Sequence, residues 1–183
     1  MSTSTRILLV PGRGNSGEKH WQTVWERHNP SYRRVLHREW HNPDCAEWVQ
    51  SLDAAINAER SPVILVAHSL AVATVAHWAT RHHGPVVGAL LVSPSDVERD
   101  DYPVGTTGFA PIPQQRLPFQ SIVVASSDDP RVTLERAALL ARAWGAQLHV
   151  PGAFGHLGTA ADLGEWHYGA HLLARLQQAA QAA

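Results

Sequence analysis

A serine at the junction between a predicted strand and a predicted helix is the first feature of this sequence that could carry chemistry. Ser69 follows the apolar run 62–67, and residues 67–71 read AHSLA, which is the pattern G-x-S-x-G with alanine at both glycine positions. A sharp turn of this kind exposes the hydroxyl above a sheet, and the next N–H, that of Leu70, points at a developing oxyanion. The alternative is a serine that only caps a helix.

Two later segments could supply the base and the acid that a nucleophilic serine needs. In α/β enzymes of this kind the three residues follow the chain order serine, acid, histidine. Asp128 and Asp129 come directly after the predicted strand 119–125, and His156 lies in a glycine-bearing loop after the last predicted strand. His156 would accept the serine proton, and an aspartate would orient the imidazole. Spacing alone leaves both aspartates open, with Asp96 as a weaker third candidate.

Alternating strands and helices must bring these distant residues together. The predicted strands are 6–10, 33–40, 62–67, 86–92, 119–125 and 147–150. The predicted helices are 18–28, one that begins around Asn42-Pro43-Asp44, 70–83, 133–144 and 163–178, and a long proline-containing loop covers 93–118. Strands that alternate with helices indicate a parallel sheet covered on both faces, with ligands at the carboxyl ends of the strands. We therefore expect a three-layer α/β fold with about six parallel strands and no lid domain.

Length and composition favour one domain, spanning residues 1–183, and exclude several classes of function. The chain has 183 residues, a formal net charge of −1 and a single cysteine, Cys45. This charge balance gives no basic surface for nucleic acid or anionic lipid, and one cysteine cannot form an internal disulfide. The apolar run 7–10 is too short for a signal peptide or a membrane span, so we expect a cytoplasmic protein without membrane contact. His37 and His41 lack the acids or cysteines of a zinc site, so no metal is expected.

The first loop allows a competing interpretation. Gly12, Gly14 and Gly17 match G-x-G-x-x-G after a predicted strand, and Glu39 follows at a suitable distance, which is the pattern of a dinucleotide-binding site. The residues after Gly17 are bulky and charged, whereas a pyrophosphate-binding helix begins with small apolar residues. In the hydrolase interpretation, a backbone N–H near Arg13 supplies the second oxyanion donor, and no cofactor is needed.

The combined motifs resemble the serine hydrolases related to retinoblastoma-binding protein nine and bacterial YdeN. The resemblance covers nearly the whole chain, in the stretches 10–17, 20–22, 25–26, 40–48, 66–70, 127–130 and 155–156. It implies a compact α/β-hydrolase that cleaves carboxylic esters, with Ser69 as nucleophile, His156 as base and Asp129, the aspartate before the proline, as acid. Ala71 stands where the family usually has glycine.

These observations predict a serine hydrolase that acts on a small carboxylic ester as its small-molecule partner. The candidate substrate-binding residues are Trp21 and Trp40, which lie near predicted strand ends, and His68, which flanks the presumed site. Packing in the core is the alternative for these residues and the preferred interpretation of the tryptophans. A catalytically silent binding module on the same fold is the alternative that Ala71 motivates. Oligomeric state is left open.

Overall fold

The computed structural model describes residues 5–182, and its centre is a six-stranded parallel sheet in the order β2-β1-β3-β4-β5-β6. The strands are β1 (Arg6–Val10), β2 (Arg33–Arg34), β3 (Val63–His68), β4 (Val86–Val92), β5 (Gln120–Val124) and β6 (Gln147–His149). Every residue of β3 is buried. Its first five residues, 63–67, are all apolar, which is typical of a central strand with helices on both faces.

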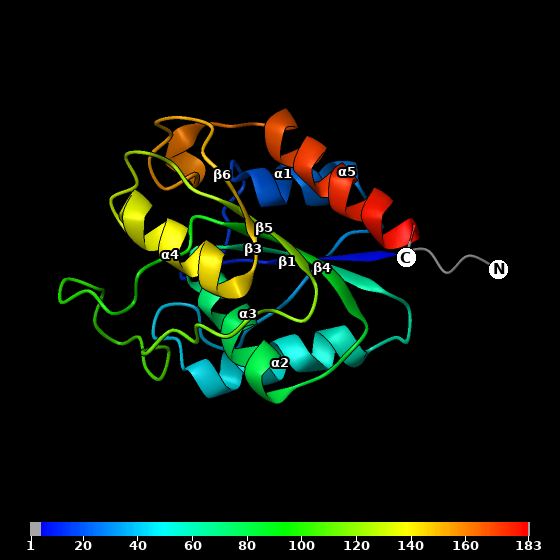
Figure 1. The fold of residues 1–183 in the computed structure, drawn as a ribbon, viewed down its shortest axis with the longest axis horizontal. Helices are drawn as coiled ribbons and strands as arrows, with labels where there is room; N and C mark the ends of the chain where they lie inside the picture. The colour runs from blue at the N-terminus through cyan, green and yellow to red at the C-terminus, as the bar shows by residue number, and fades with distance from the viewer. Residues whose placement is uncertain (1–4, 183) are drawn as a thin grey trace.

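Within residues 5–182, five α-helices and one short 3₁₀ helix accompany the sheet (Figure 1). They are α1 (Trp21–His28), α2 (Cys45–Asn57), α3 (Leu70–Arg81), α4 (Leu134–Trp144), η1 (Thr159–Ala161) and α5 (His167–Gln181). Side-chain caps define several of their starts: the Thr133 hydroxyl accepts the N–H of Arg136 at α4, and α4 ends at Gly145 in the left-handed conformation.

The helices form two layers that bury different faces of the sheet. Alternate residues of the strands, such as Leu65, pack with α2, α3 and α4 in one core cluster. The intervening residues, such as Val66, pack with α1 and α5 in a second cluster. Figure 1 shows α1 and α5 on one side of the sheet with α2 and α3 on the other. The predicted three-layer α/β architecture is confirmed.

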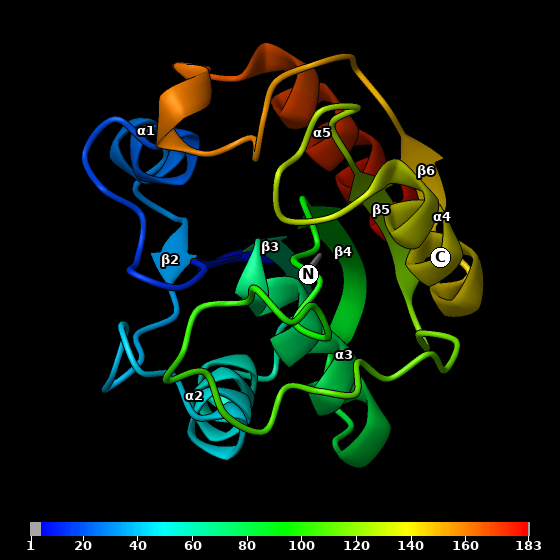
Figure 2. The same cartoon turned by 90° about the vertical axis from the view of Figure 1, so that its left-hand side faces the viewer.

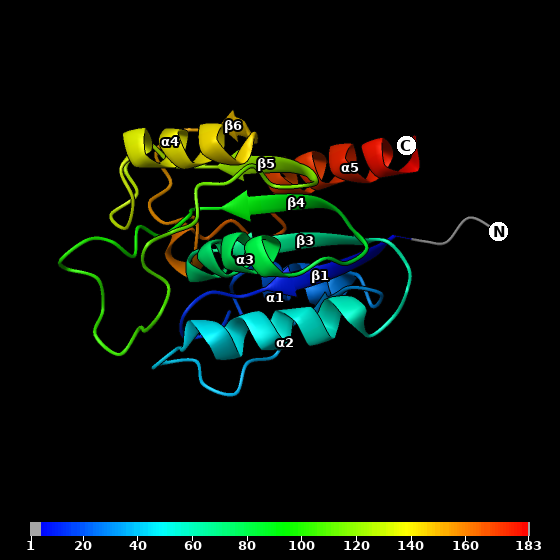
Figure 3. The same ribbon diagram turned by 60° about the horizontal axis from the view of Figure 1, so that its bottom comes forward.

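The strand order places the loop after β1 and the turn after β3 side by side at the carboxyl edge of the sheet. From β1 the chain crosses to β2 on one side and then returns to β3 on the other, so β1 and β3 are neighbours with Val10 opposite Ala67. In an open parallel sheet this reversal is the usual ligand site. In Figure 3 the arrow of β4 points to the side from which the long loop before β5 projects, and Figure 2 views the molecule from that side.

Several predicted bounds differ from the structure. The helices predicted over 18–28 and 163–178 are Trp21–His28 and His167–Gln181, and two further elements differ for reasons that the structure shows. The strand predicted over 33–40 is only Arg33–Arg34, because the chain then turns so that the His37 ring stacks on Trp48, with ring centroids 4.0 Å apart. The second helix begins at Cys45 rather than near Asn42, because the Asp44 carboxylate accepts the N–H of Glu47 and so caps the helix. Both differences arise from contacts with other segments or from the choice between neighbouring capping residues.

The segment 93–118 forms no regular helix or strand, as predicted. Phe109, Ile112 and Leu117 are nevertheless buried and fasten it to the core around α2 and α3. Within the part of the chain that the structure describes, no helix combines the length and the apolar character needed to cross a bilayer.

Candidate active site

Ser69 lies in a tight turn between β3 and α3. Its backbone has φ 61° and ψ −125°, a conformation that residues other than glycine rarely adopt. The N–H of Ser69 donates to the Val92 carbonyl of the neighbouring strand, at 2.9 Å, which holds the turn in place. Ala71, the second residue of α3, is fully buried. The turn therefore forms with alanine at the position where glycine is usual.

The first glycine of the loop after β1 is required by this turn. A Cβ atom at Gly12 would lie 2.7 Å from the Cβ of Ser69 and 2.9 Å from the carbonyl oxygen of His68. These distances are shorter than real contacts, so only glycine lets the two loops approach this closely. Gly12 thus serves the serine turn, a role that the G-x-G-x-x-G pattern did not indicate.

The structure brings Ser69, His156 and Asp129 into one hydrogen-bonded line. The Oγ of Ser69 lies 2.8 Å from the Nε2 of His156, and the Nδ1 of His156 lies 2.9 and 3.0 Å from the two carboxylate oxygens of Asp129. The Asp129 side chain is fully buried, whereas that of His156 is 24% exposed. An ionised carboxylate only accepts hydrogen bonds, so Nδ1 carries the proton and Nε2 accepts from the serine hydroxyl.

The two neighbouring aspartates have separate contacts. Asp129 Oδ1 accepts the N–H of Arg131 at 2.8 Å in addition to facing the imidazole. Asp128 Oδ1 accepts the Ser126 hydroxyl and the N–H of Gly155, both at 2.7 Å, and these two bonds lower the pKa of the Asp128 carboxyl. Asp128 therefore ties the loop after β5 to the loop that carries His156. Of the two aspartates between which spacing did not choose, Asp129 is the one that contacts the imidazole of His156.

Two backbone N–H groups beside Ser69 are available to an incoming oxyanion. Within residues 5–182, the N–H groups of Leu70 and Arg13 donate to no backbone or side-chain acceptor. Leu70 is the first residue of α3, so its N–H is one of the donors that a helix start leaves without a partner. The helix dipole also favours negative charge at this end.

Ser95, in the loop after β4, is a site residue that the sequence analysis missed. Its Oγ lies 2.8 Å from the Oγ of Ser69, and the residue is only 3% exposed. Because Ser69 donates to His156, the Ser95 hydroxyl donates to Ser69. Ser95 also lies beside Tyr102: burial raises the pKa of this phenol, while the Ser95 hydroxyl acts in the opposite direction. No motif marks Ser95, since only the pairing of β3 with β4 brings it beside Ser69.

Ser95→Ala is expected to reduce the rate of reaction at Ser69 by roughly threefold to tenfold, the effect of losing one neutral hydrogen bond. The bond holds the nucleophile in the orientation that faces His156. The measurement is the second-order rate of Ser69 modification by a fluorophosphonate. Ser93→Ala is the matched control, since the buried Ser93 hydroxyl has no partner among the described residues. Equal rates for the two variants would contradict a positioning role.

The three predicted substrate-binding residues lie outside the cavity beside Ser69. Trp21 is 1% exposed, and its indole N–H donates to the Leu157 carbonyl at 2.8 Å. His68 is buried beneath the site; burial lowers its pKa well below the usual value, and its neutral ring donates from Nε2 to the His156 carbonyl. Trp40 packs against Trp48. Trp21 and His68 thus support the loop that carries His156 instead of facing the cavity. Both rings pack among other aromatic rings, Trp21 against Trp25 and His68 against His20.

Two cavities meet at His156. One, of about 190 Å³, is lined by Ser69, His156 and five further residues: Arg13, Ser95, Tyr102, Pro103 and Arg131. The other, of about 590 Å³, continues from Arg131 and His156 along the loop 153–161. The Ser69 hydroxyl and the His156 imidazole therefore open on a smaller cavity that holds two arginines, and His156 and Arg131 also border the larger one.

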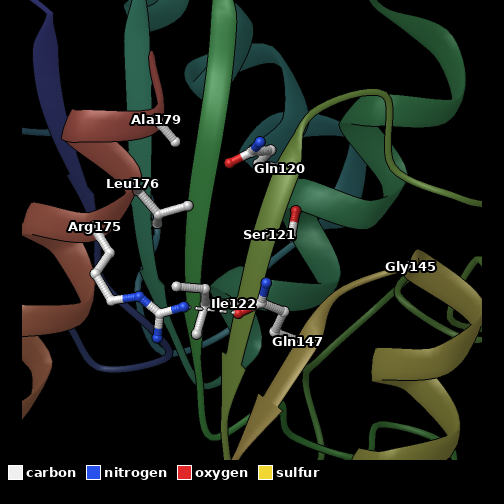
Figure 4. Close-up of a pocket in the computed structure, with 8 residues that line it drawn as sticks. All are labelled: Gln120, Ser121, Ile122, Gly145, Gln147, Arg175, Leu176 and Ala179. Carbon is white, nitrogen blue, oxygen red and sulfur yellow. Dashed lines mark hydrogen bonds between the residues drawn. The ribbon is translucent and has the colours of Figure 1, made fainter. Parts of the chain in front are cut away.

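A further cavity of about 250 Å³ lies at the opposite end of the sheet, near the amino ends of β5 and β6. Figure 4 shows the Arg175 side chain of α5 reaching Gln147 across its mouth, where the guanidinium donates to Oε1 at 3.2 Å. Ser121, the one hydroxyl in its lining, donates to the Phe119 carbonyl. Without a base beside that hydroxyl, this cavity offers no counterpart to the Ser69 arrangement.

The structure does not favour dinucleotide binding at the first loop. His20 caps α1, with its Nδ1 accepting the N–H of Gln22, so a buried imidazole occupies the helix start where a pyrophosphate would bind. Gly12 is taken up by its contact with Ser69. As for metals, residues 5–182 contain no group of three or more histidine, cysteine, aspartate or glutamate side chains that could hold an ion.

Comparisons with known proteins agree with this geometry. The chain matches the family model for serine hydrolases over residues 7–175. It is similar to a YdeN-like hydrolase from Pectobacterium atrosepticum, with a TM-score of 0.86 and 30% identity over 98% of this chain and 94% of that chain. It is similar in fold to the ydeN gene product of B. subtilis (TM-score 0.73, 18% identity, 94% of this chain and 98% of that one). A thermophilic esterase from Thermogutta terrifontis also shares the fold (TM-score 0.68, 15% identity, 97% and 92%).

A search of curated proteins found no match to the chain. The family model covers most of the sequence, and the Pectobacterium structure matches at nearly full length on both sides. Both findings support hydrolase activity. The chain belongs to the serine hydrolase family of the α/β-hydrolase superfamily.

Proposed function

We propose that this protein hydrolyses small carboxylic esters through an acyl-enzyme on Ser69, with His156 as the general base and Asp129 as the orienting acid. The observation that carries the proposal is the hydrogen-bonded line from Ser69 through His156 to the buried Asp129, with the serine held in a strained turn at a helix start. Structural hydroxyls rarely combine these features, which are the arrangement needed to activate a serine.

The reaction has two steps in which the same groups exchange roles. Ser69 Oγ forms a bond to the ester carbonyl carbon while its proton passes to Nε2 of His156. The carbon–oxygen bond to the alcohol then breaks, and the imidazolium returns the proton to the leaving alkoxide. Water deacylates the enzyme by the same sequence, so ester and water give acid and alcohol. Asp129 stabilises the imidazolium in both steps.

The N–H groups of Leu70 and Arg13 would bind the oxyanion of each tetrahedral intermediate. Both lack acceptors among the described residues; Leu70 directly follows Ser69, and Arg13 lines the same cavity as Ser69. One such donor contributes about 3–4 kcal/mol to the stability of the transition state. The cavity of about 190 Å³ beside Ser69 favours small acyl groups.

Labelling with a fluorophosphonate probe tests the proposal. The folded wild-type protein should gain one phosphonyl group at Ser69, located by peptide mass spectrometry, and should hydrolyse p-nitrophenyl acetate faster than the octanoate. Ser69→Ala should show neither reaction. Ser127→Ala is the matched control, because Ser127 is exposed and lies in the neighbouring loop after β5. A folded protein that is neither labelled nor active on esters would contradict the proposal and favour a silent binding module.

A further inference from the structure

Two arginines that the triad chemistry does not use line the cavity beside Ser69. Arg13 lies in the loop after β1, and Arg131 lies in the loop that carries Asp129; both line the same cavity as Ser95 and Tyr102. The two guanidinium groups lie close enough to Tyr102 to oppose, together with Ser95, the rise in its pKa that burial causes. A cavity with two cations and two hydroxyls is suited to an anionic group rather than to an aliphatic chain.

The Arg13 guanidinium is held in one orientation. Its Nε donates to the His41 carbonyl at 2.9 Å, and its Nη2 donates to the Val104 carbonyl at 3.1 Å. An arginine carries five N–H donors, so three remain after these two bonds. Anchoring by neutral carbonyls also leaves the positive charge uncompensated.

The nearby carboxylates form their ion pairs with other groups, although Arg131 contributes to lowering the pKa of the exposed Asp101 carboxyl. Asp96 and Glu98 pair with Arg136, and Asp101 pairs with Arg99. Among residues 5–182, no carboxylate oxygen lies within ion-pair distance of the Arg13 or Arg131 side chain. The remaining acid of the site, Asp129, faces the imidazole of His156. The cavity therefore retains a local excess of positive charge, although the whole chain has a net charge of −1.

The second cavity shares Arg131 and His156 with the first but adds Phe154 and the alanines of the loop 153–161, whereas Ser69 and Arg13 line only the first. His156 must deliver a proton to the leaving alcohol, and the second cavity continues from His156, so we place the alcohol half of the ester there. The acyl half then occupies the cationic cavity, whose volume of about 190 Å³ equals that of about six liquid water molecules at about 30 Å³ each and so suits a short acyl group.

We propose that the acyl half of the substrate carries a carboxylate bound by Arg13 and Arg131, so that the substrate class is the monoester of a short dicarboxylic acid. This inference rests on the ester hydrolysis proposed above. Hydrolysis of such a monoester consumes one water and yields the dicarboxylate and the free alcohol. The ester carbonyl lies against Ser69, the distal carboxylate lies between the arginines, and the alcohol lies along Phe154 and the alanines.

The test compares kcat/KM for monoethyl succinate with that for ethyl succinamate, in which a neutral amide replaces the carboxylate. Wild-type protein is expected to prefer the anionic ester by tenfold or more, and added salt should reduce this preference because Arg131 is exposed. Arg131→Gln should lower the ratio of the two kcat/KM values by about tenfold, the effect of losing one charge-assisted hydrogen bond. Arg131→Lys should keep most of the preference.

Arg142→Gln is the matched control, since Arg142 is an exposed arginine near the end of α4 and outside the site. In this variant the ratio of kcat/KM for monoethyl succinate to that for ethyl succinamate should equal the wild-type ratio. Hydrolysis of both esters without an anionic preference, or a ratio that Arg131→Gln leaves unchanged, would overturn the inference while leaving ester hydrolysis intact. Absence of any ester turnover together with absence of Ser69 labelling would instead overturn the proposed function.

Discussion

Asp129→Asn is expected to lower kcat for a short-chain ester by about 10⁴-fold while leaving KM nearly unchanged. Asparagine has nearly the same shape, and its oxygen can still accept the Arg131 N–H. Its NH₂ group, however, turned toward His156, favours the tautomer with the proton on Nε2. That nitrogen then cannot accept the Ser69 proton, and the imidazolium loses its buried counter-charge. Steady-state kinetics with p-nitrophenyl acetate would measure the loss.

Asp128→Asn provides the comparison for this change. Asp128 accepts from the Ser126 hydroxyl and from the N–H of Gly155 through the same oxygen, Oδ1. An asparagine oxygen can keep both bonds, so kcat should fall by less than about tenfold. The two residues are adjacent in sequence and undergo the same substitution, which separates orientation of the base from support of its loop. A larger loss of kcat for Asp128→Asn than for Asp129→Asn would show that Asp128, rather than Asp129, orients His156.

Acidification from pH 7 to pH 5 is expected to destabilise the fold by several kcal/mol. Burial lowers the pKa of His20 and of His37 to about 4, in His20 with help from Arg34 and His156 and in His37 against the opposing effect of Glu47. In the unfolded chain both histidines titrate near about 6.5. Their stabilising contribution is thus complete above that value and is lost as the pH falls toward 4, since the unfolded state binds more protons.

Each of these histidines accounts for about 2 kcal/mol between pH 6.5 and 5, from 1.5 pH units at about 1.4 kcal/mol per unit. Total stabilities of domains are about 5–15 kcal/mol, so the combined effect is large. Urea unfolding at pH 7 and pH 5 measures it. His68, whose pKa burial lowers well below its usual value, acts in the same direction.

His37→Phe isolates one of these contributions. The His37 ring stacks on Trp48, and neither of its nitrogens has a hydrogen-bond partner among the described residues. Phenylalanine keeps the stacking but cannot bind a proton, so the difference in unfolding free energy between pH 7 and pH 5 should shrink by about 2 kcal/mol. His83→Gln, at an exposed position, should leave the difference unchanged. An equal pH dependence in wild type and His37→Phe would refute this account.

Much of the fold could be predicted because its signals are local. The largely apolar sequences of β3 and β4 are typical of strands buried on both faces, and their alternation with helices indicates a parallel sheet. The order of a serine turn, an aspartate pair and a histidine loop pointed to one edge of that sheet. The short β2 and the start of α2 were misplaced because the stacking of His37 on Trp48 and the choice of Asp44 as cap depend on spatial neighbours.

The sequence by itself determined the fold class, the three-layer arrangement and the three segments that could carry the reacting groups, since periodicity and turn chemistry extend over only a few residues. Only the tertiary structure decided which aspartate faces His156, that Gly12 serves the serine turn, and that Ser95, Tyr102 and Arg131 surround Ser69. It also placed Trp21 and His68 beneath the site. The reason is that pairing of distant strands, rather than spacing along the chain, sets which side chains share a cavity.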